Sequence, residues 1–194
     1  AEFVRRSSCM GLFDVFKKKD TIGHMAVKVQ AEAPHGVPAG IDAASGALAA
    51  PVSGRVIAMS DIPDPVFSSE VLGKGCAIWP ESTVAYAPCS GTVSVVMGHA
   101  VGLVADDGVE VLVHVGIDTV DMNGEGFSGY VSTGARVEAG EPLLAFDREA
   151  IAAAGHPDCV VLAVSNSAEY GSVKLIPTAG DAVEAGAPLL EVTK

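Results

Sequence analysis

The stretch that decides the fold is Met97-Gly-His-Ala-Val-Gly-Leu-Val-Ala-Asp-Asp-Gly-Val-Glu-Val-Leu-Val-His-Val-Gly-Ile-Asp-Thr-Val120. Two runs rich in valine, a residue favoured in strands, flank Asp106-Asp107-Gly108. An Asp-Gly pair between such runs is typical of a hairpin turn, because glycine readily adopts the positive φ that the turn requires. The stretch therefore predicts an antiparallel β-hairpin.

Two histidines, His99 and His114, lie on the two arms of this hairpin. If Asp107-Gly108 is the loop, the two residues are diagonal neighbours, and if Asp106-Asp107 is the loop, they are directly opposite. Either register places both imidazoles on one face, with Cβ atoms roughly 5 to 8 Å apart. A three-residue loop would place them on opposite faces. We expect an even register and hence a facing pair.

A facing pair of imidazoles is suited to metal binding or to nucleophilic catalysis. Structural zinc normally takes four protein ligands and catalytic zinc three, so two histidines are an incomplete set. A neutral imidazole is a nucleophile near pH 7, and a second imidazole can donate a hydrogen bond to a phosphoryl oxygen. The sequence has no P-loop or other Gly-rich nucleotide motif. A phosphoryl group would therefore come from another protein rather than from ATP.

Two further segments of the chain each occur twice. Ala50-Pro-Val-Ser-Gly-Arg-Val56 is similar to Ala87-Pro-Cys-Ser-Gly-Thr-Val93, and Ala135-Arg-Val-Glu-Ala-Gly-Glu-Pro-Leu-Leu144 is similar to Asp181-Ala-Val-Glu-Ala-Gly-Ala-Pro-Leu-Leu190. Each copy combines a strand with a glycine turn, which predicts an all-β fold, an antiparallel sandwich or barrel built from a duplicated unit. One short helix is expected over residues 148–154, between a capping Asp147 and Gly155.

Composition excludes several classes of protein. The net charge of −12 would repel nucleic acid and attract a basic protein partner. The four cysteines are widely spaced, which argues against a disulfide scaffold or a zinc knuckle. No apolar run approaches the roughly 20 residues of a membrane span, and no apolar segment of a secretory signal follows Arg5-Arg6. We expect a cytoplasmic protein.

The chain divides near residue 48. Residues 1–48 are expected to form a flexible N-terminal segment, since 31–48 is rich in Ala, Gly and Pro and has no period. Residues 49–194 are expected to form one domain. Within the first part, residues 10–19 combine apolar side chains with three lysines. This pattern predicts a short amphipathic segment that contacts an anionic membrane surface, against the alternative of a terminus without a role.

The chain from about Ala49 to Lys194 also resembles a known family, the glucose-type enzyme IIA domain of the bacterial phosphoenolpyruvate-dependent sugar phosphotransferase system. The resemblance rests on Ile62-Pro-Asp-Pro-Val-Phe67, Gly98-His-Ala100, Val113-His-Val-Gly-Ile-Asp-Thr-Val120 and Gly124-Glu-Gly-Phe127. Met97 is a departure, because the family often has threonine there, and its hydroxyl hydrogen bond to the histidines is lost.

The resemblance implies an antiparallel β-sandwich and a phosphotransferase that requires no cofactor. His114 would be phosphorylated on Nε2, and His99 would stabilise the phosphoryl group. The donor would be the histidine phosphocarrier protein, the acceptor a cysteine of an enzyme IIB domain, and regulatory targets are further partners. His99 and His114 could bind zinc at a partner interface, with a ligand from the partner. The implied docking residues are Asp64, Val66, Phe67, Asp118 and Val120.

Three other functions compete with this one. A regulatory binding module without phosphoryl transfer stays open. A zinc hydrolase would use the His114-x-x-x-Asp118 spacing but needs a later His-x-His pair, and only His156 follows. A lipoyl- or biotin-carrying domain needs a lysine at a hairpin tip, which the sequence lacks.

Overall fold

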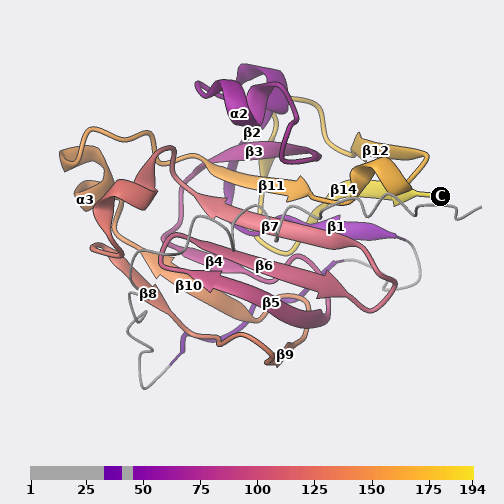
Figure 1. Ribbon diagram of the computed structural model, residues 1–194, viewed down its shortest axis with the longest axis horizontal. Helices are drawn as coiled ribbons and strands as arrows, with labels where there is room; N and C mark the ends of the chain where they lie inside the picture. The colour runs from indigo at the N-terminus through magenta and orange to yellow at the C-terminus, as the bar shows by residue number, and fades with distance from the viewer. Residues whose placement is uncertain (1–32, 41–45) are drawn as a thin grey trace, which may run out of the picture.

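The computed structural model describes residues 33–40 and 46–194 (Figure 1). Strands dominate it, with two short helices, α2 and α3, and three 3₁₀ turns, η1 to η3. In chain order the elements are β1 (Ala47–Ala49), β2 (Gly54–Ala58), η1 (Met59–Asp61), α2 (Pro65–Ser68), β3 (Lys74–Pro80), β4 (Val84–Tyr86), β5 (Gly91–Met97), β6 (Ala100–Ala105), β7 (Glu110–Val115), η2 (Thr119–Met122), β8 (Phe127–Gly129), β9 (Arg136–Val137), β10 (Pro142–Phe146), α3 (Arg148–Ala153), β11 (Val160–Val164), η3 (Ser167–Glu169), β12 (Ser172–Leu175), β13 (Ala182–Val183) and β14 (Pro188–Thr193).

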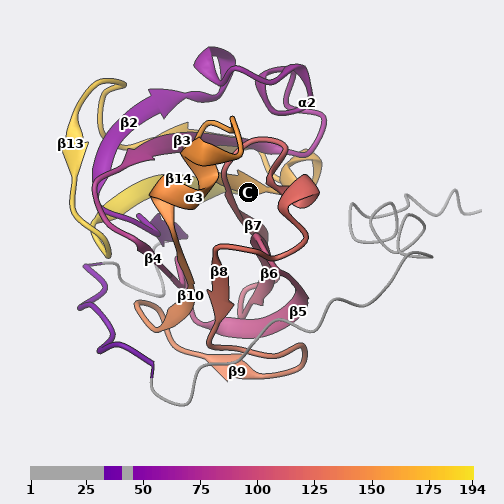
Figure 2. The same cartoon turned by 90° about the vertical axis from the view of Figure 1, so that its left-hand side faces the viewer.

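The strands of the described residues form three antiparallel sheets. The large sheet has eight strands in the order β13-β2-β3-β11-β7-β6-β5-β9, and the small sheets have the orders β1-β14-β12 and β4-β10-β8. Figure 2 shows the large sheet curving from β13, through β2 and β3, round to β5 and β9. The prediction of an all-β antiparallel fold is confirmed.

Both faces of the large sheet are apolar where it is central. Along β11, Val160 and Leu162 face the main core between the sheets, whereas Val161 and Ala163 belong to a second cluster with Phe67 of α2. The alternation of side chains along a strand accounts for this division. Helix α2 therefore packs on the centre of the outer face of the large sheet, and this is the face on which His114 lies beside Val161.

The two repeated segments occupy equivalent places in the fold. The two copies of the first segment, 50–56 and 87–93, lead into β2 and β5. The two copies of the second segment, 181–190 and 135–144, contain β13–β14 and β9–β10. Strand β13 pairs with β2 and β9 pairs with β5, so the two copies close the two ends of the large sheet. This arrangement explains why similar sequences recur at these four places.

Residues 33–40, which we call the strap, contact both copies of the second repeat. The Val37 amide donates to the Gly140 carbonyl at 2.9 Å, and the Gly40 amide donates to the Gly186 carbonyl at 2.8 Å. Gly140 and Gly186 are equivalent residues of the repeat, so the strap bridges two matching turns. The division expected at residue 48 falls inside β1, because Ala47 pairs with Glu191 of β14. The segment 10–19 lies outside the described residues.

The hairpin between β6 and β7 exists, but its predicted even register is wrong. His114 pairs with Ala100, and the Ala105 amide donates to the Val109 carbonyl, so the loop has three residues. Gly108 has a φ of +92° and closes this loop as its last residue. Asp107 fixes the loop by accepting from the Val109 amide at 3.1 Å. A three-residue loop that ends on a left-handed glycine is a common alternative to the two-residue turn.

The predicted short helix is confirmed as α3. Asp147 caps it by accepting from the amides of Glu149 and Ala150, and Gly155 follows its end with a φ of +84°. Among the described residues, no helix is long and apolar enough to cross a membrane. Cys76, Cys89 and Cys159 are free and buried, and burial raises the pKa of each thiol to about 12.

Candidate functional site

His114 lies in the middle of the large sheet. It is the fifth residue of β7 and pairs with Ala100 of β6 on one side and Val161 of β11 on the other. Only 8% of the residue is exposed. Because β7 is hydrogen-bonded to a strand on each side, the backbone from which the His114 ring extends is held in place on the outer face of the sheet.

His99 reaches the same place from a turn rather than from a strand. Met97 pairs with Ala100, which leaves Gly98 and His99 as a two-residue turn between β5 and β6. The observed register would pair His99 with Val115 and direct a strand side chain to the opposite face. A turn residue is free of this alternation, so the His99 ring can bend toward His114. The Val115 amide still donates to the His99 carbonyl at 2.8 Å, which anchors the turn.

The two imidazoles, which we call the histidine pair, are in contact. Their ring centroids are 4.7 Å apart at an interplanar angle of 74°. Phe67 lies against His114 with a centroid distance of 5.0 Å, and Phe127 lies near His99 at 6.4 Å. The four rings therefore form a continuous aromatic row, Phe67–His114–His99–Phe127. Such edge-to-face contacts are the preferred geometry of aromatic rings.

Burial keeps the histidine pair neutral. It lowers the pKa of His99 to about 4. Burial, together with the neighbouring His99, lowers the pKa of His114 to about 3. The backbone of Gly116 opposes this second shift, although it does not reach hydrogen-bond geometry with the enclosed Nδ1 atom of His114. At neutral pH both rings therefore have a free nitrogen lone pair, which nucleophilic attack requires.

Helix α2 holds Phe67 over His114. Asp64 caps the helix by accepting from the amides of Val66 and Phe67 at 2.8 and 2.9 Å. Pro65 occupies the first helical position, where its missing N–H costs nothing. Phe67 is 6% exposed and packs on the histidine, whereas Val66 is 46% exposed. Of the predicted docking residues on α2, the outward apolar one is thus Val66.

The loop after β7 forms the other border of the site. Thr119 is fully buried, and its hydroxyl donates to the Val115 carbonyl at 2.6 Å. Gly116 has a φ of +76°, and a Cβ there would lie 2.3 Å from the Thr119 side chain. These contacts turn the chain sharply and bring Asp118 and Val120 out to the surface, where Val120 is 61% exposed.

Two residues of the site have no assigned role in the sequence-based prediction. Phe127 closes the aromatic row, and Gly98 packs so closely on Gly124 that a Cβ at residue 98 would lie 2.9 Å from the Gly124 Cα. The motifs Gly98-His-Ala100 and Gly124-Glu-Gly-Phe127 contain them. Both motifs belong to the family resemblance, and this resemblance was the feature of the sequence that could have pointed to Gly98 and Phe127.

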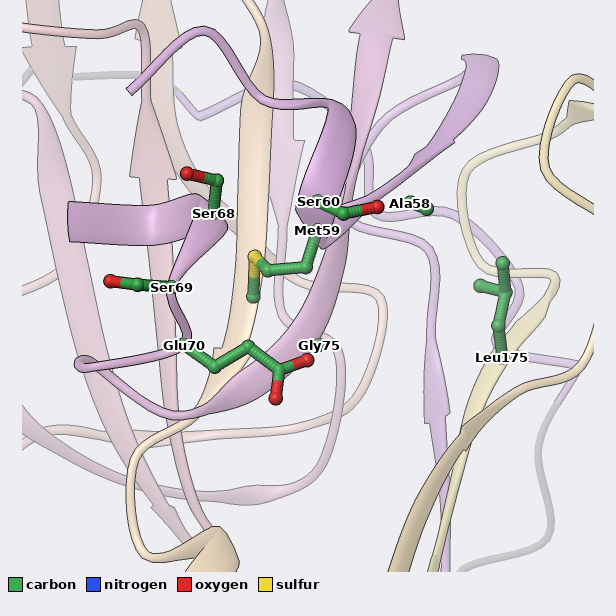
Figure 3. Close-up of a pocket in the computed structure, with 8 residues that line it drawn as sticks. All are labelled: Ala58, Met59, Ser60, Ser68, Ser69, Glu70, Gly75 and Leu175. Carbon is green, nitrogen blue, oxygen red and sulfur yellow. The ribbon is translucent and has the colours of Figure 1, made fainter. Parts of the chain in front are cut away.

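Neither member of the histidine pair lines the hollow of about 410 Å³ beside α2 and η1. The lining of this hollow includes Met59, Ser69 and Glu70 (Figure 3). Met59 extends from η1 toward α2 and belongs to the same apolar cluster as Phe67. The histidine pair itself is nearly buried, with 6% of His99 and 8% of His114 exposed.

Metal binding by this chain alone finds no support. Within residues 33–40 and 46–194, no group of three or more His, Cys, Asp or Glu side chains is placed to hold a metal ion. The histidine pair offers two ligands, fewer than a zinc site takes.

Comparisons with known proteins agree with this geometry. Residues 46–170 match the family model described as phosphoenolpyruvate-dependent sugar phosphotransferase system, EIIA 1. The chain is 43% identical over 132 residues to the PTS system mannose-specific EIIBCA component of Corynebacterium glutamicum, which covers 67% of this chain and 19% of that protein. It is 45% identical over 107 residues to the PTS system glucose-specific EIIA component of Staphylococcus aureus, which covers 54% of this chain and 64% of that protein.

A solved structure supports the same assignment. Glucose permease IIA from Mycoplasma capricolum matches with a TM-score of 0.66 and 30% identity, over 74% of this chain and 93% of that one. The chain spans only 19% of the length of the two corynebacterial EIIBCA relatives that it matches. Family model, identity and fold coincide over the part of the chain that contains the histidine pair. The chain belongs to the EIIA 1 family of the phosphoenolpyruvate-dependent sugar phosphotransferase system.

Proposed function

We propose that this chain is a phosphocarrier in which His114 accepts a phosphoryl group from the histidine phosphocarrier protein and passes it to a cysteine of an enzyme IIB domain. The observation that carries the proposal is the contact of two buried, neutral imidazoles, 4.7 Å apart, with the exposed apolar side chains of Val66 and Val120 on the adjoining α2 and η2. Such an exposed apolar border suits an exchange between proteins. With a transporter domain as acceptor, the reaction would take place in the cytoplasm beside a membrane.

The first step would form a bond between His114 and phosphorus. The Nδ1 atom of His114 is enclosed, which leaves Nε2 as the attacking nitrogen. In the neutral ring the proton then resides on Nδ1, toward the Gly116 backbone, and Nε2 carries the lone pair. As Nε2 bonds to phosphorus, the phosphorus–nitrogen bond of the donor's phosphohistidine breaks, and the donor keeps that electron pair.

The second step would reverse these roles. A cysteine thiolate of the acceptor attacks phosphorus, the bond from phosphorus to Nε2 of His114 breaks, and the ring regains its lone pair. His99 would donate a hydrogen bond to the phosphoryl oxygens while they carry charge. Because His99 is buried beside His114, little water competes for this interaction.

Docking would use the exposed border of the site. Val66 on α2 and Val120 on η2 are both exposed apolar residues. Asp64 and Asp118 would meet a basic partner, in keeping with the net charge of −12. Phe67 is buried and packs on His114, so it would support the histidine rather than contact the partner directly. Zinc could bind the histidine pair only if a partner supplied the remaining ligands.

The test is phosphorylation with purified components. Incubation with phosphoenolpyruvate, enzyme I and the phosphocarrier protein should yield acid-labile phosphohistidine, and His114→Ala should abolish it. His99→Ala should still accept the phosphoryl group but pass it on poorly to an enzyme IIB domain. Labelling of the His114→Ala chain would show the assignment to be wrong. Labelling of the unmodified chain without onward transfer would favour the regulatory binding module instead.

A further inference from the structure

The orientation of the His99 ring depends on aromatic packing. Within residues 33–40 and 46–194, its side chain takes part in no hydrogen bond, and its ring contacts are His114 and Phe127. A residue in a two-residue turn also lacks the strand neighbours that restrict a side chain such as His114. If His99 must point at a phosphoryl group on His114, another group has to limit its rotation.

Phe127 has the position and the rigidity to do this. Its ring lies 6.4 Å from that of His99 at 69°, within the range of edge-to-face packing. Phe127 is itself 7% exposed and pairs with Phe146 across β8 and β10. His99 is thus held between a fixed histidine on one side and a fixed phenylalanine on the other.

A contact between two glycines sets the spacing of this arrangement. Gly98 immediately precedes His99, and its backbone lies so near Gly124 that a Cβ would reach within 2.9 Å of the Gly124 Cα. Gly124 in turn accepts a hydrogen bond from the Phe127 amide at 3.2 Å. The turn that carries His99 and the turn that leads into Phe127 are therefore locked together through backbone atoms.

We propose that Phe127 is a positioning residue for His99, and that the Gly98–Gly124 contact fixes the distance between them. This inference rests on the proposed function, in which His99 stabilises the phosphoryl group on His114. Loss of the Phe127 ring should widen the range of His99 orientations and slow transfer to the acceptor. Acceptance from the donor should change little, because the attacking His114 keeps its own contact with Phe67.

Phe127→Leu and Phe146→Leu are a matched pair for the test. Both remove a buried ring from neighbouring positions of one sheet, but only Phe127 contacts a histidine. We expect Phe127→Leu to slow transfer to the enzyme IIB domain by about tenfold, since small misplacements of a catalytic group cost at least that much. Phe146→Leu should change this rate by less than about twofold. Equal slowing by both variants would overturn the inference.

A second readout follows the His99 ring without any transfer reaction. In NMR titrations, Phe127→Leu should raise the pKa of His99 from about 4 toward its ordinary value, because the smaller leucine covers less of the imidazole and lets water reach it. Phe146→Leu should leave the pKa of His99 unchanged. An unchanged titration of His99 in Phe127→Leu would overturn the positioning role even if transfer slowed. Absence of phosphohistidine in the unmodified chain would instead overturn the proposed function and leave this measurement valid.

Gly98→Ala tests the spacing independently. Gly98 does not have a positive φ, so alanine adds only the contact with Gly124. Transfer to the acceptor should slow in this variant as in Phe127→Leu. Gly40→Ala is the control, because a Cβ there meets its neighbours at an ordinary 3.5 Å. Transfer at the unmodified rate in Gly98→Ala would show that the glycine contact does not set the spacing.

Discussion

Mild acid should destabilise this protein through the histidine pair. Burial lowers the pKa of His99 to about 4 and, with the effect of His99 added, that of His114 to about 3, from an ordinary value of 6.5. In the unfolded chain both rings take up a proton as the pH falls through 6.5, whereas in the folded chain they stay neutral until about pH 4 and pH 3. The unfolded chain therefore binds more protons across this window, and the free energy of unfolding decreases as the pH falls.

The size of the effect follows from these values. A shift of one pKa unit corresponds to about 1.4 kcal/mol. Between pH 7 and pH 5, each histidine should lower the free energy of unfolding by about 2 kcal/mol, and the pair by about 4 kcal/mol. A domain of this kind is stable by only about 5–15 kcal/mol, so the loss would be easily measured.

Urea unfolding at pH 7, 6 and 5 provides the assay. The unmodified chain is compared with His99→Gln, His114→Gln and the double variant, since glutamine does not titrate and is of similar size. Each single variant should lose about 2 kcal/mol less than the unmodified chain between pH 7 and pH 5. The carboxylates are the same in all four chains, so their effect cancels in the comparison. If the double variant lost as much stability as the unmodified chain, the account of two buried neutral rings would be refuted.

Two further predictions concern the supports of the fold and site. Asp64→Ala should lower the free energy of unfolding by about 1 kcal/mol through loss of the helix cap and should also slow phosphoryl transfer by loosening α2. Asp147→Ala removes the equivalent cap of α3, and in denaturation and transfer assays it should reproduce only the loss of stability. Gly140→Ala should release the strap, because a Cβ there would lie 2.0 Å from the Val37 carbonyl oxygen. The Val37 amide should then exchange hydrogen faster, whereas Gly134→Ala, at a similar φ but in open space, should leave its protection unchanged.

The sequence predicts the elements of this fold better than their exact alignment. Valine-rich runs around Asp106-Asp107-Gly108 predict a hairpin, but the same three residues fit loops of two or three residues. The choice depends on the side chain of Asp107 and on the left-handed Gly108, which local propensity does not rank. A shift of the strand register by one residue moves every side chain of the strand to the opposite face of the sheet. The face on which a side chain lies is therefore the part of such a prediction that fails most easily.

The histidine pair also shows that local sequence does not determine which side chains meet. The two rings come together although the predicted register is wrong, because His99 belongs to a turn and His114 to a strand. Phe127 lies 28 residues after His99, and the pairing of β8 with β10 and the contact of Gly98 with Gly124 bring its ring to His99. Contacts of this kind arise from the tertiary fold and have no period or spacing that a sequence pattern can reveal.

The duplicated turns have a consequence for association between copies of the protein. The strands at the two ends of the large sheet, β9 and β13, are each two residues long. Long exposed edge strands invite pairing with another chain and, through it, aggregation, whereas very short ones provide few free backbone groups. A strand approaching either end would find the chain turning away at Gly140 or Gly186. The same repeat therefore protects both edges of the sheet against edge-to-edge growth.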